Sequence, residues 1–289
     1  MKRLLVIIFT IIGITACTEK MMIEPQEGQQ LVGVSGSITD VYMKQEVVLS
    51  YTTPFYGTNT VMISDATVYV VDGIDTIWYE ESERPGYYYS VNEFAGQVGH
   101  NYHLSIDFYD QEGHQHFYSE STMNENVEQV DSIRIKPWVF NDLHDDNFLG
   151  VYPYFLTTDN PKTYYMTRVL INGNDVGGDT LTRCMLFETY GYAGIYFNGP
   201  LMVMIAGEMP IDGLDQRDSI EVVHKGDTVT MDLWSIPGDY AHYISEISAS
   251  IGTNPMMGTP SNVSTNIKPD GLAVGCFHAS SRRRCSVIY

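Results

Sequence analysis

The residue with the most clearly specified chemistry in this 289-residue chain is Cys17. Lys2 and Arg3 precede an apolar run of about eleven residues that ends at Ile14, and two small residues separate that run from Cys17. A basic start, a short apolar run and small residues are typical of a secretory signal peptide. A cysteine directly after them indicates lipidation. We therefore predict a lipoprotein signal peptide over residues 1–16 and acylation of Cys17.

Two alternatives apply to this segment. A transmembrane helix needs about 20 apolar residues, which is more than the run provides. An ordinary cleaved signal with Cys17 merely nearby is the other alternative. One acyl chain binds a bilayer only marginally, whereas two or more anchor a protein stably. Bacterial lipoprotein cysteines carry several chains, so we expect a permanent attachment to the lipid bilayer, with residues 17–30 as a polar tether.

Four side chains around the turn Glu112-Gly113 have types that could bind a metal ion. His103 and Asp107 share one face of an expected strand, and His114 and His116 share a face of the next. Imidazole and carboxylate groups are ligands of zinc and related ions. The spacing matches no zinc signature, and the alternative is a set of solvated polar residues. We therefore predict no metal and no cofactor, and keep these four residues as candidates.

A second cluster, Asp142 with His144, Asp145 and Asp146, lies in an expected loop. Calcium prefers carboxylate and carbonyl oxygens. The cluster lacks the residue order of a known calcium loop, and the alternative is a solvated acidic loop.

Three cysteines remain after Cys17, namely Cys184, Cys276 and Cys285. An exported protein can form disulfides. Cys276 and Cys285 are close in sequence and could close a small loop, although sequence alone cannot choose among the three pairings. The alternative is free, buried thiols, which behave as small hydrophobic groups.

Tyrosine is abundant, with 21 residues, and it clusters at 87–89, at 152–154 and at 190–196. Tyrosine is favoured at interfaces because a large ring is joined to a polar tip. We predict a partner surface made of Tyr190, Tyr192, Tyr196 and Phe197. The alternative is that these rings pack between sheets, as aromatic residues commonly do in β proteins.

Composition excludes some classes of function. The formal net charge of −20 repels nucleic acid, so we expect no nucleic-acid partner. The sequence contains no nucleophile elbow, no zinc-protease motif and no phosphate loop. We therefore predict that the protein is not an enzyme and has no catalytic residues.

Alternating apolar and polar residues recur along the chain, for example at 32–38, 66–71, 102–108 and 228–233. Short turns rich in glycine and aspartate separate these runs. This pattern predicts a mainly β protein built from antiparallel sandwiches. A polar run near 122–131 divides the expected strands into an N-terminal domain over 31–122 and a larger C-terminal antiparallel domain over 131–289.

One segment of the second domain has helical spacing instead. Pro237 and Asp239 suit a helix start, and Tyr240, Ile244 and Ile251 recur on one face. We predict one amphipathic helix near 237–251, packed on a sheet.

A series of motifs then resembles known families. The runs Val32-x-Val34-x-Gly36, Asp65-Ala66-Thr67-Val68 and Gly99-x-x-Tyr102 resemble an immunoglobulin-like β-sandwich, the carboxypeptidase-regulatory-like (transthyretin-like) module. With the lipidation motif, Gly226-Asp227-Thr228-Val229 and Thr265-Asn266-Ile267, the chain resembles the domain-of-unknown-function 4249 lipoproteins. One departure is Cys276 at a position where the family tends to have tyrosine.

The resemblance implies an outer-membrane lipoprotein of the cell envelope that serves as an accessory to a TonB-dependent receptor. It carries over no catalytic residue. We therefore predict an exported, non-catalytic binding protein whose ligand is a small molecule, a peptide or a glycan. The alternatives are a hydrolase or metal-dependent enzyme on the C-terminal domain, and a structural or assembly factor of the envelope.

Overall fold

The computed structural model describes residues 30–53, 60–140, 143–176, 184–199, 203–206, 222–250 and 263–289. The signal segment, Cys17, the tether up to residue 29 and Asp142 lie outside this part. The side chains of His144, Asp145 and Asp146 lie outside it as well, so the calcium hypothesis stays a prediction.

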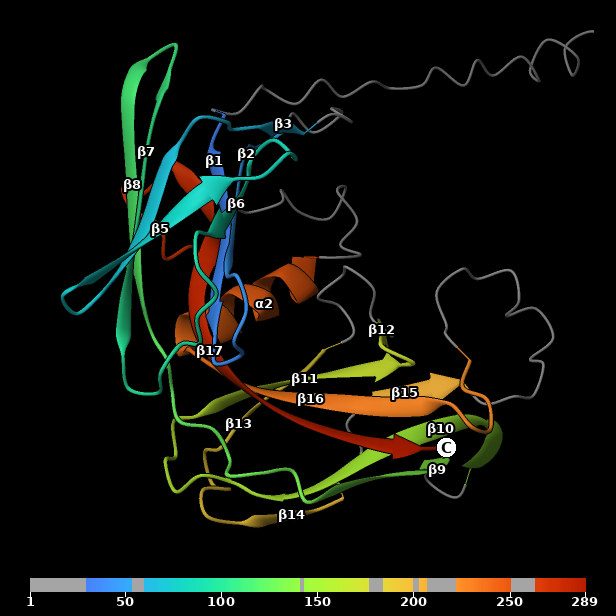
Figure 1. The fold of residues 1–289 in the computed structure, drawn as a ribbon. Coiled ribbons are helices and arrows are strands. Elements are labelled where there is room, and N and C mark those ends of the chain that lie inside the picture. Colours follow the sequence, from blue (N-terminus) through green and yellow to red (C-terminus); the bar gives the residue numbers. More distant parts are fainter. Residues whose placement is uncertain are drawn as a thin grey trace, which may run out of the picture.

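Strands dominate the fold, which confirms the predicted mainly β class. Figure 1 shows two β bodies, one formed by the N-terminal strands and one by the later strands. The main sheet has 13 strands, eleven of them in the order β12-β11-β16-β17-β1-β2-β6-β5-β4-β7-β8, with β13 paired to β11 and β3 paired to β2. A second sheet contains β9, β10, β14 and β15.

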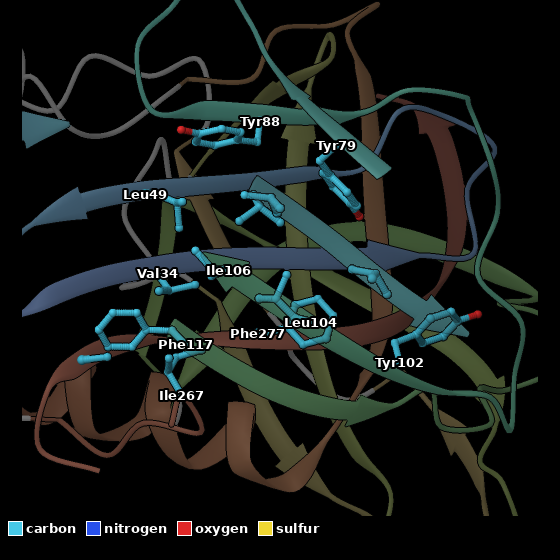
Figure 2. Packing of buried hydrophobic residues seen from close by; sticks show 14 of the residues in the cluster. Val34, Leu49, Tyr79, Tyr88, Tyr102, Leu104, Ile106, Phe117, Ile267 and Phe277 are labelled. Atoms are coloured by element: carbon cyan, nitrogen blue, oxygen red, sulfur yellow. The ribbon is translucent and has the colours of Figure 1, made fainter. Parts of the chain in front are cut away.

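The first body is a sandwich whose sheet curls until its early strands face its late strands. It contains β1 (Val32–Thr39), β2 (Glu46–Tyr51), β3 (Val61–Met62), β4 (Thr67–Asp72), β5 (Asp75–Glu81), β6 (Tyr87–Ser90), β7 (Asn101–Asp110) and β8 (Gly113–Thr122). Figure 2 shows Val34 and Leu49, from β1 and β2, packed with Ile106 and Phe117, from β7 and β8. The period-2 pattern therefore buries one side of each strand in a shared core.

The second body packs two sheets face to face. It contains β9 (Ser132–Phe140), β10 (Leu143–Leu156), β11 (Tyr164–Ile171), β12 (Asn174–Asp175), β13 (Met185–Glu188), β14 (Tyr196–Asn198), β15 (Val203–Ala206) and β16 (Thr228–Ile236). Val151 and Phe155 of β10 meet Met231 and Leu233 of β16 in its core. Each strand turns alternate residues inward, as the sequence pattern predicted.

One long strand, β17 (Ala273–Ile288), belongs to both bodies. Residues 273–280 pair in parallel with β1, and residues 281–288 pair antiparallel with β16. The prediction assigned all of 131–289 to the second domain. The first half of β17 instead extends the sheet of the first sandwich, and this makes the main sheet continuous through the molecule.

The structure does not form the possible Cys276–Cys285 disulfide, and the alternative of two thiols holds. Both cysteines are free and lie on β17, nine residues apart. Cys276 lies opposite Ser35 in the first sandwich and Cys285 opposite Met231 in the second, and nine residues of strand span up to about 30 Å. A disulfide needs Cα atoms about 4.4–6.8 Å apart. Cys184, the other cysteine in the described part of the chain, also forms no disulfide there.

The predicted helix is confirmed as α2 (Gly238–Ser250). Its Tyr240, Ala241 and Ile244 are buried in a small core that includes Met166 of β11 and Cys276 of β17. The helix therefore covers the side of the β11-β16-β17 sheet opposite the second sandwich's core (Figure 1). Within the described ranges, no helix combines the length and apolarity needed to span a membrane.

The basic run at 282–284 fixes the region where β17 passes from one body to the other. The Arg283 guanidinium pairs with Asp40 at 2.9 Å and donates to the carbonyl oxygens of Val127 and Glu128. Arg284 makes two hydrogen bonds of 2.6 Å to the carboxylate of Asp232, which is buried. The bonds of Arg283 therefore hold residues 127–128 of the connecting segment 123–131 against β17, and its ion pair ties β17 to Asp40 of the first sandwich.

Candidate binding surface on the second sandwich

The outer side of the β9-β10-β14 sheet carries the feature that we call the tyrosine face. In β10, Val151, Pro153 and Phe155 are buried, so Tyr152, Tyr154 and Leu156 project from the other side. Strand register brings further side chains beside them: Arg134 pairs with Tyr152, and Tyr196 pairs with Leu156. The tyrosine face consists of Arg134, Lys136, Tyr152, Tyr154, Leu156 and Tyr196.

Two cations lie over the rings of this face. The Arg134 guanidinium is 4.9 Å from the ring centroid of Tyr154, and the Lys136 ammonium is 5.2 Å from that of Tyr152. Cations in such positions are attracted by the ring's negative face. Lys136 also donates a hydrogen bond of 3.0 Å to the Tyr154 hydroxyl oxygen, and this bond lowers the pKa of Tyr154.

At its other end the tyrosine face meets an acidic groove of about 530 Å³. The groove is bounded by the connecting segment and by the end of β10; its lining residues are Glu125, Asn126, Val127, Glu128, Gln129, Asp131, Leu156, Thr157, Thr158, Asp159 and Tyr196. The Tyr196 hydroxyl donates a 2.8 Å hydrogen bond to Asp131. That bond lowers the pKa of Asp131 and raises the pKa of Tyr196.

The structure separates the four residues of the predicted partner surface. Tyr190, Tyr192 and Tyr196 are exposed. Phe197 instead points inward, with its ring centroid 5.1 Å from that of Phe155, and Tyr192 stacks on it at 5.9 Å. Phe197 is therefore a support for the surface and not a part of it, because neighbouring residues of β14 alternate between the two sides of the sheet.

A buried threonine fixes the turn that carries these tyrosines. The Thr157 hydroxyl donates to the carbonyl oxygen of Tyr192 and accepts from the backbone N–H of Ile195 at 3.0 Å. The turn is thus held by the residue that directly follows the exposed Leu156. A surface held in this way needs little ordering when a partner binds.

Sequence reasoning missed the cations and the groove. It noted Tyr152 and Tyr154 as a local cluster, and the spacing of Arg134 and Lys136 also indicates a shared face. The pairing of β9 with β10 is what brings these two pairs together, and that register is not visible in either segment alone.

The histidine candidates lie far from this surface, on β7 and β8 of the first sandwich. His114 Nε2 and His116 Nδ1 approach the same Asp107 Oδ1 at 3.1 and 2.9 Å, while His103 lies beside Glu120 at 3.5 Å. The structure therefore brings three of the four candidates together. Among the residues that it describes, no group of three or more histidine, cysteine or acidic side chains is arranged to hold a metal ion.

The buried cysteines do not resemble activated nucleophiles. Burial raises the pKa of Cys276 and of Cys184 above the ordinary thiol value. A raised pKa keeps a cysteine in its weakly nucleophilic thiol form. Cys276 and Cys184 are therefore weak nucleophiles in this structure.

Comparison of the sequence with models of protein families identifies the family of this chain. The model of DUF4249, a domain of unknown function, matches residues 18–285, and the chain belongs to this family. A search of curated proteins finds no match. A solved structure of a DUF4785 family protein from Legionella pneumophila aligns with 70% of this chain and 51% of its own length, at 9% identity and a TM-score of 0.25. The chain thus spans about half of that protein.

Proposed function

We propose that this protein is a non-catalytic lipoprotein of the outer membrane, anchored through Cys17, that binds a ligand or partner through its tyrosine face. Its role is that of an accessory to a TonB-dependent receptor. The lipidation motif that ends at Cys17 supports the class of protein, and the geometry of the second sandwich supports a binding role.

The observation that carries the proposal is the exposure of large side chains beside a groove. Leu156 and Tyr196 are paired across β10 and β14, yet they remain 55% and 47% exposed. Both also line the acidic groove. A contiguous patch of exposed apolar and aromatic groups next to a concave site is typical of a binding surface.

The position of the face supports a role away from the anchor. The predicted tether leads into β1, which belongs to the first sandwich. The tyrosine face lies on the far side of the second sandwich, beyond the layer that α2 covers (Figure 1). A short tether would therefore leave this face free while keeping it at high local concentration beside a membrane receptor.

The experiment is cross-linking and recovery of the native lipoprotein from its own membranes. We expect recovery of a TonB-dependent receptor with the unchanged protein, and a loss with the double variant Leu156→Ser and Tyr196→Ser. The matched control is Tyr109→Ser, because Tyr109 is an exposed tyrosine on the first sandwich. Equal recovery with all three proteins, or recovery of no receptor, would contradict the proposal.

The anchor has a separate test. Cys17→Ser should abolish labelling by a radioactive fatty acid and release the protein from the membrane fraction. Persistent labelling would show that the lipid is attached elsewhere or that residues 1–16 are not a lipoprotein signal.

A further inference from the structure

Two basic residues of the tyrosine face, Arg134 and Lys136, lie side by side next to the acidic groove. Four arginines of the described residues are paired with carboxylates: Arg168 with Asp175, Arg282 and Arg284 with Asp232, and Arg283 with Asp40. Arg134 and Lys136 make no ion pair within the described part of the chain. Both are exposed, and their charged groups lie over the rings of Tyr152 and Tyr154.

Strand geometry fixes these two cations in one place. Residues two apart on a strand project from the same side, about 7 Å from each other. Arg134 lies opposite Tyr152, and Lys136 lies opposite Gly150, which has no side chain beside the ammonium group. The hydrogen bond from Lys136 to the Tyr154 hydroxyl restrains the more flexible of the two side chains. The pair is therefore an exposed and partly ordered site for an anion.

The rest of the tyrosine face restricts the kind of anion. From Tyr152 to Leu156 the face extends about 13 Å along β10, because a strand rises about 3.3 Å per residue. Its far end meets Glu128, Asp131 and Asp159 in the acidic groove. Those carboxylates repel a polyanion but accept hydrogen bonds from hydroxyl groups. The exposed ring of Tyr196, where the face meets the groove, suits a flat group with an apolar side.

We infer that the tyrosine face binds an acidic oligosaccharide, one that carries a carboxylate on some of its sugar rings. The sugar carboxylate lies between Arg134 and Lys136, where guanidinium and ammonium groups donate charge-assisted hydrogen bonds. A ring stacks on Tyr196, and hydroxyl groups donate to the carboxylates of the groove. This inference rests on the proposed binding role of the tyrosine face and names the chemical class of its ligand.

The probe is a galactose oligosaccharide that carries a single galacturonate ring (the oligogalacturonate below). It is compared with the neutral galactose oligosaccharide of the same length by titration calorimetry on the full lipoprotein in detergent. We expect binding of the acidic probe, a loss of affinity at high salt because the cations are exposed, and weak or no binding of the neutral probe. Equal affinity for both probes would overturn the inference. Stronger binding of a short polyglutamate would assign the face to acidic peptides and would overturn it as well.

Variants locate the site. The double variant Arg134→Gln and Lys136→Gln should weaken binding of the oligogalacturonate by about tenfold or more, since each lost charge-assisted hydrogen bond is worth about one factor of ten in affinity. Tyr154→Phe should weaken it less, because the ring remains. The matched control is Lys162→Gln, an exposed lysine of the same sandwich outside the tyrosine face. Unchanged melting temperatures will show that the variants fold.

The same variants distinguish this inference from the proposed function. If the Arg134→Gln and Lys136→Gln variant still recovers the receptor and the unchanged protein does not bind the oligogalacturonate, the inferred ligand class is wrong and the proposed binding role stands. If the receptor is recovered equally with the Leu156→Ser and Tyr196→Ser variant while the oligogalacturonate binds as expected, the receptor role fails and the sugar site stands. If the Arg134→Gln and Lys136→Gln variant binds the oligogalacturonate as tightly as the unchanged protein does, the inference is overturned.

Discussion

On the outer side of the first sandwich, His114 and His116 lie beside Asp107, and His103 lies beside Glu120. On the tyrosine face of the second sandwich, Arg134 and Lys136 lie over tyrosine rings and meet no carboxylate within the described part of the chain. Both surfaces also expose aromatic side chains, for example Tyr118 and Tyr196.

The difference shows which observation indicates a binding site in an acidic β protein. Exposed aromatic residues occur on both sandwiches and are normal when scattered. Charges that the protein pairs internally need no ligand, whereas cations without a carboxylate partner favour an external anion. The balance of charge therefore separates the two faces more clearly than their aromatic content does.

The largest expected effect comes from truncating a buried side chain in either core. Phe277→Ala acts on the first core and Leu233→Ala on the second, and both residues are fully buried. Such truncations cost about 2–5 kcal/mol. Because β17 is part of both sheets, we expect each variant to lower the free energy of unfolding of one shared transition in urea, followed by circular dichroism. Two separate transitions, each shifted by only one variant, would show that the sandwiches unfold independently.

The second prediction concerns Gly275 of β17, which packs closely against the backbone of β1. Gly275 has a φ of 102°, and a Cβ atom there would lie 1.9 Å from the carbonyl oxygen of Val34. We expect Gly275→Ala to cost more than about 2 kcal/mol, because backbone strain and a clash with backbone act together. Gly226→Ala is the control, since Gly226 has a φ of 95° and open space around it. Equal losses of unfolding free energy for the two variants would contradict the close approach.

The third prediction tests the bonds that join the sandwiches. Arg283→Ala removes the ion pair with Asp40 and two hydrogen bonds to the connecting segment. We expect a loss of about 1–3 kcal/mol in unfolding free energy and faster amide hydrogen exchange over residues 125–131. Lys268→Ala is the control, because its ion pair with Asp270 is exposed and such pairs are worth about 0–1 kcal/mol. Unchanged exchange in the segment would mean that Arg283 does not hold it.

The smallest expected effect is a change in the pKa of Asp131. A tyrosine of the tyrosine face should control this pKa, and a tyrosine of the first sandwich should not. Asp131 accepts a hydrogen bond from Tyr196, so its pKa in the folded protein lies below the ordinary aspartate value. The contribution of this bond to stability is present above the ordinary aspartate pKa and is lost as the pH falls through the lowered pKa. Tyr196→Phe should raise the pKa of Asp131 toward the ordinary value in an NMR titration, and Tyr109→Phe should leave it unchanged. A low pKa that persists in Tyr196→Phe would assign the shift to Gln129, its other donor.

Local sequence patterns predicted the elements well. Alternating apolar residues indicated the strands, and the spacing after Pro237 indicated α2, because each pattern reports one buried side of one element. The same reasoning failed for Cys276 and Cys285. Two nearby cysteines suggested a closed loop, but the segment between them is one continuous strand that pairs with β1 at one end and with β16 at the other.

The candidate site was predictable only in part. The sequence indicated exposed tyrosines at 190–196, and three of the four named residues are exposed. Phe197 was assigned to the wrong side because the start of β14 decides which residues face inward, and strand register cannot be read from so short a segment. The positions of Arg134 and Lys136 beside Tyr152 and Tyr154 depend on pairing between two strands, which no single segment specifies.

The place of β17 also has a consequence for synthesis. Its partners in the first sandwich, residues 32–39, leave the ribosome about 240 residues before it does. Neither sandwich has all its strands until Ala273–Ile288 has been made. Until then, β1 and β16 each have an edge without its partner strand. Contacts between such distant residues form slowly and leave unpaired strands exposed meanwhile. A nonsense mutation anywhere before Ala273 would therefore remove a strand from both sandwiches at once, including the one encoded at the opposite end of the gene.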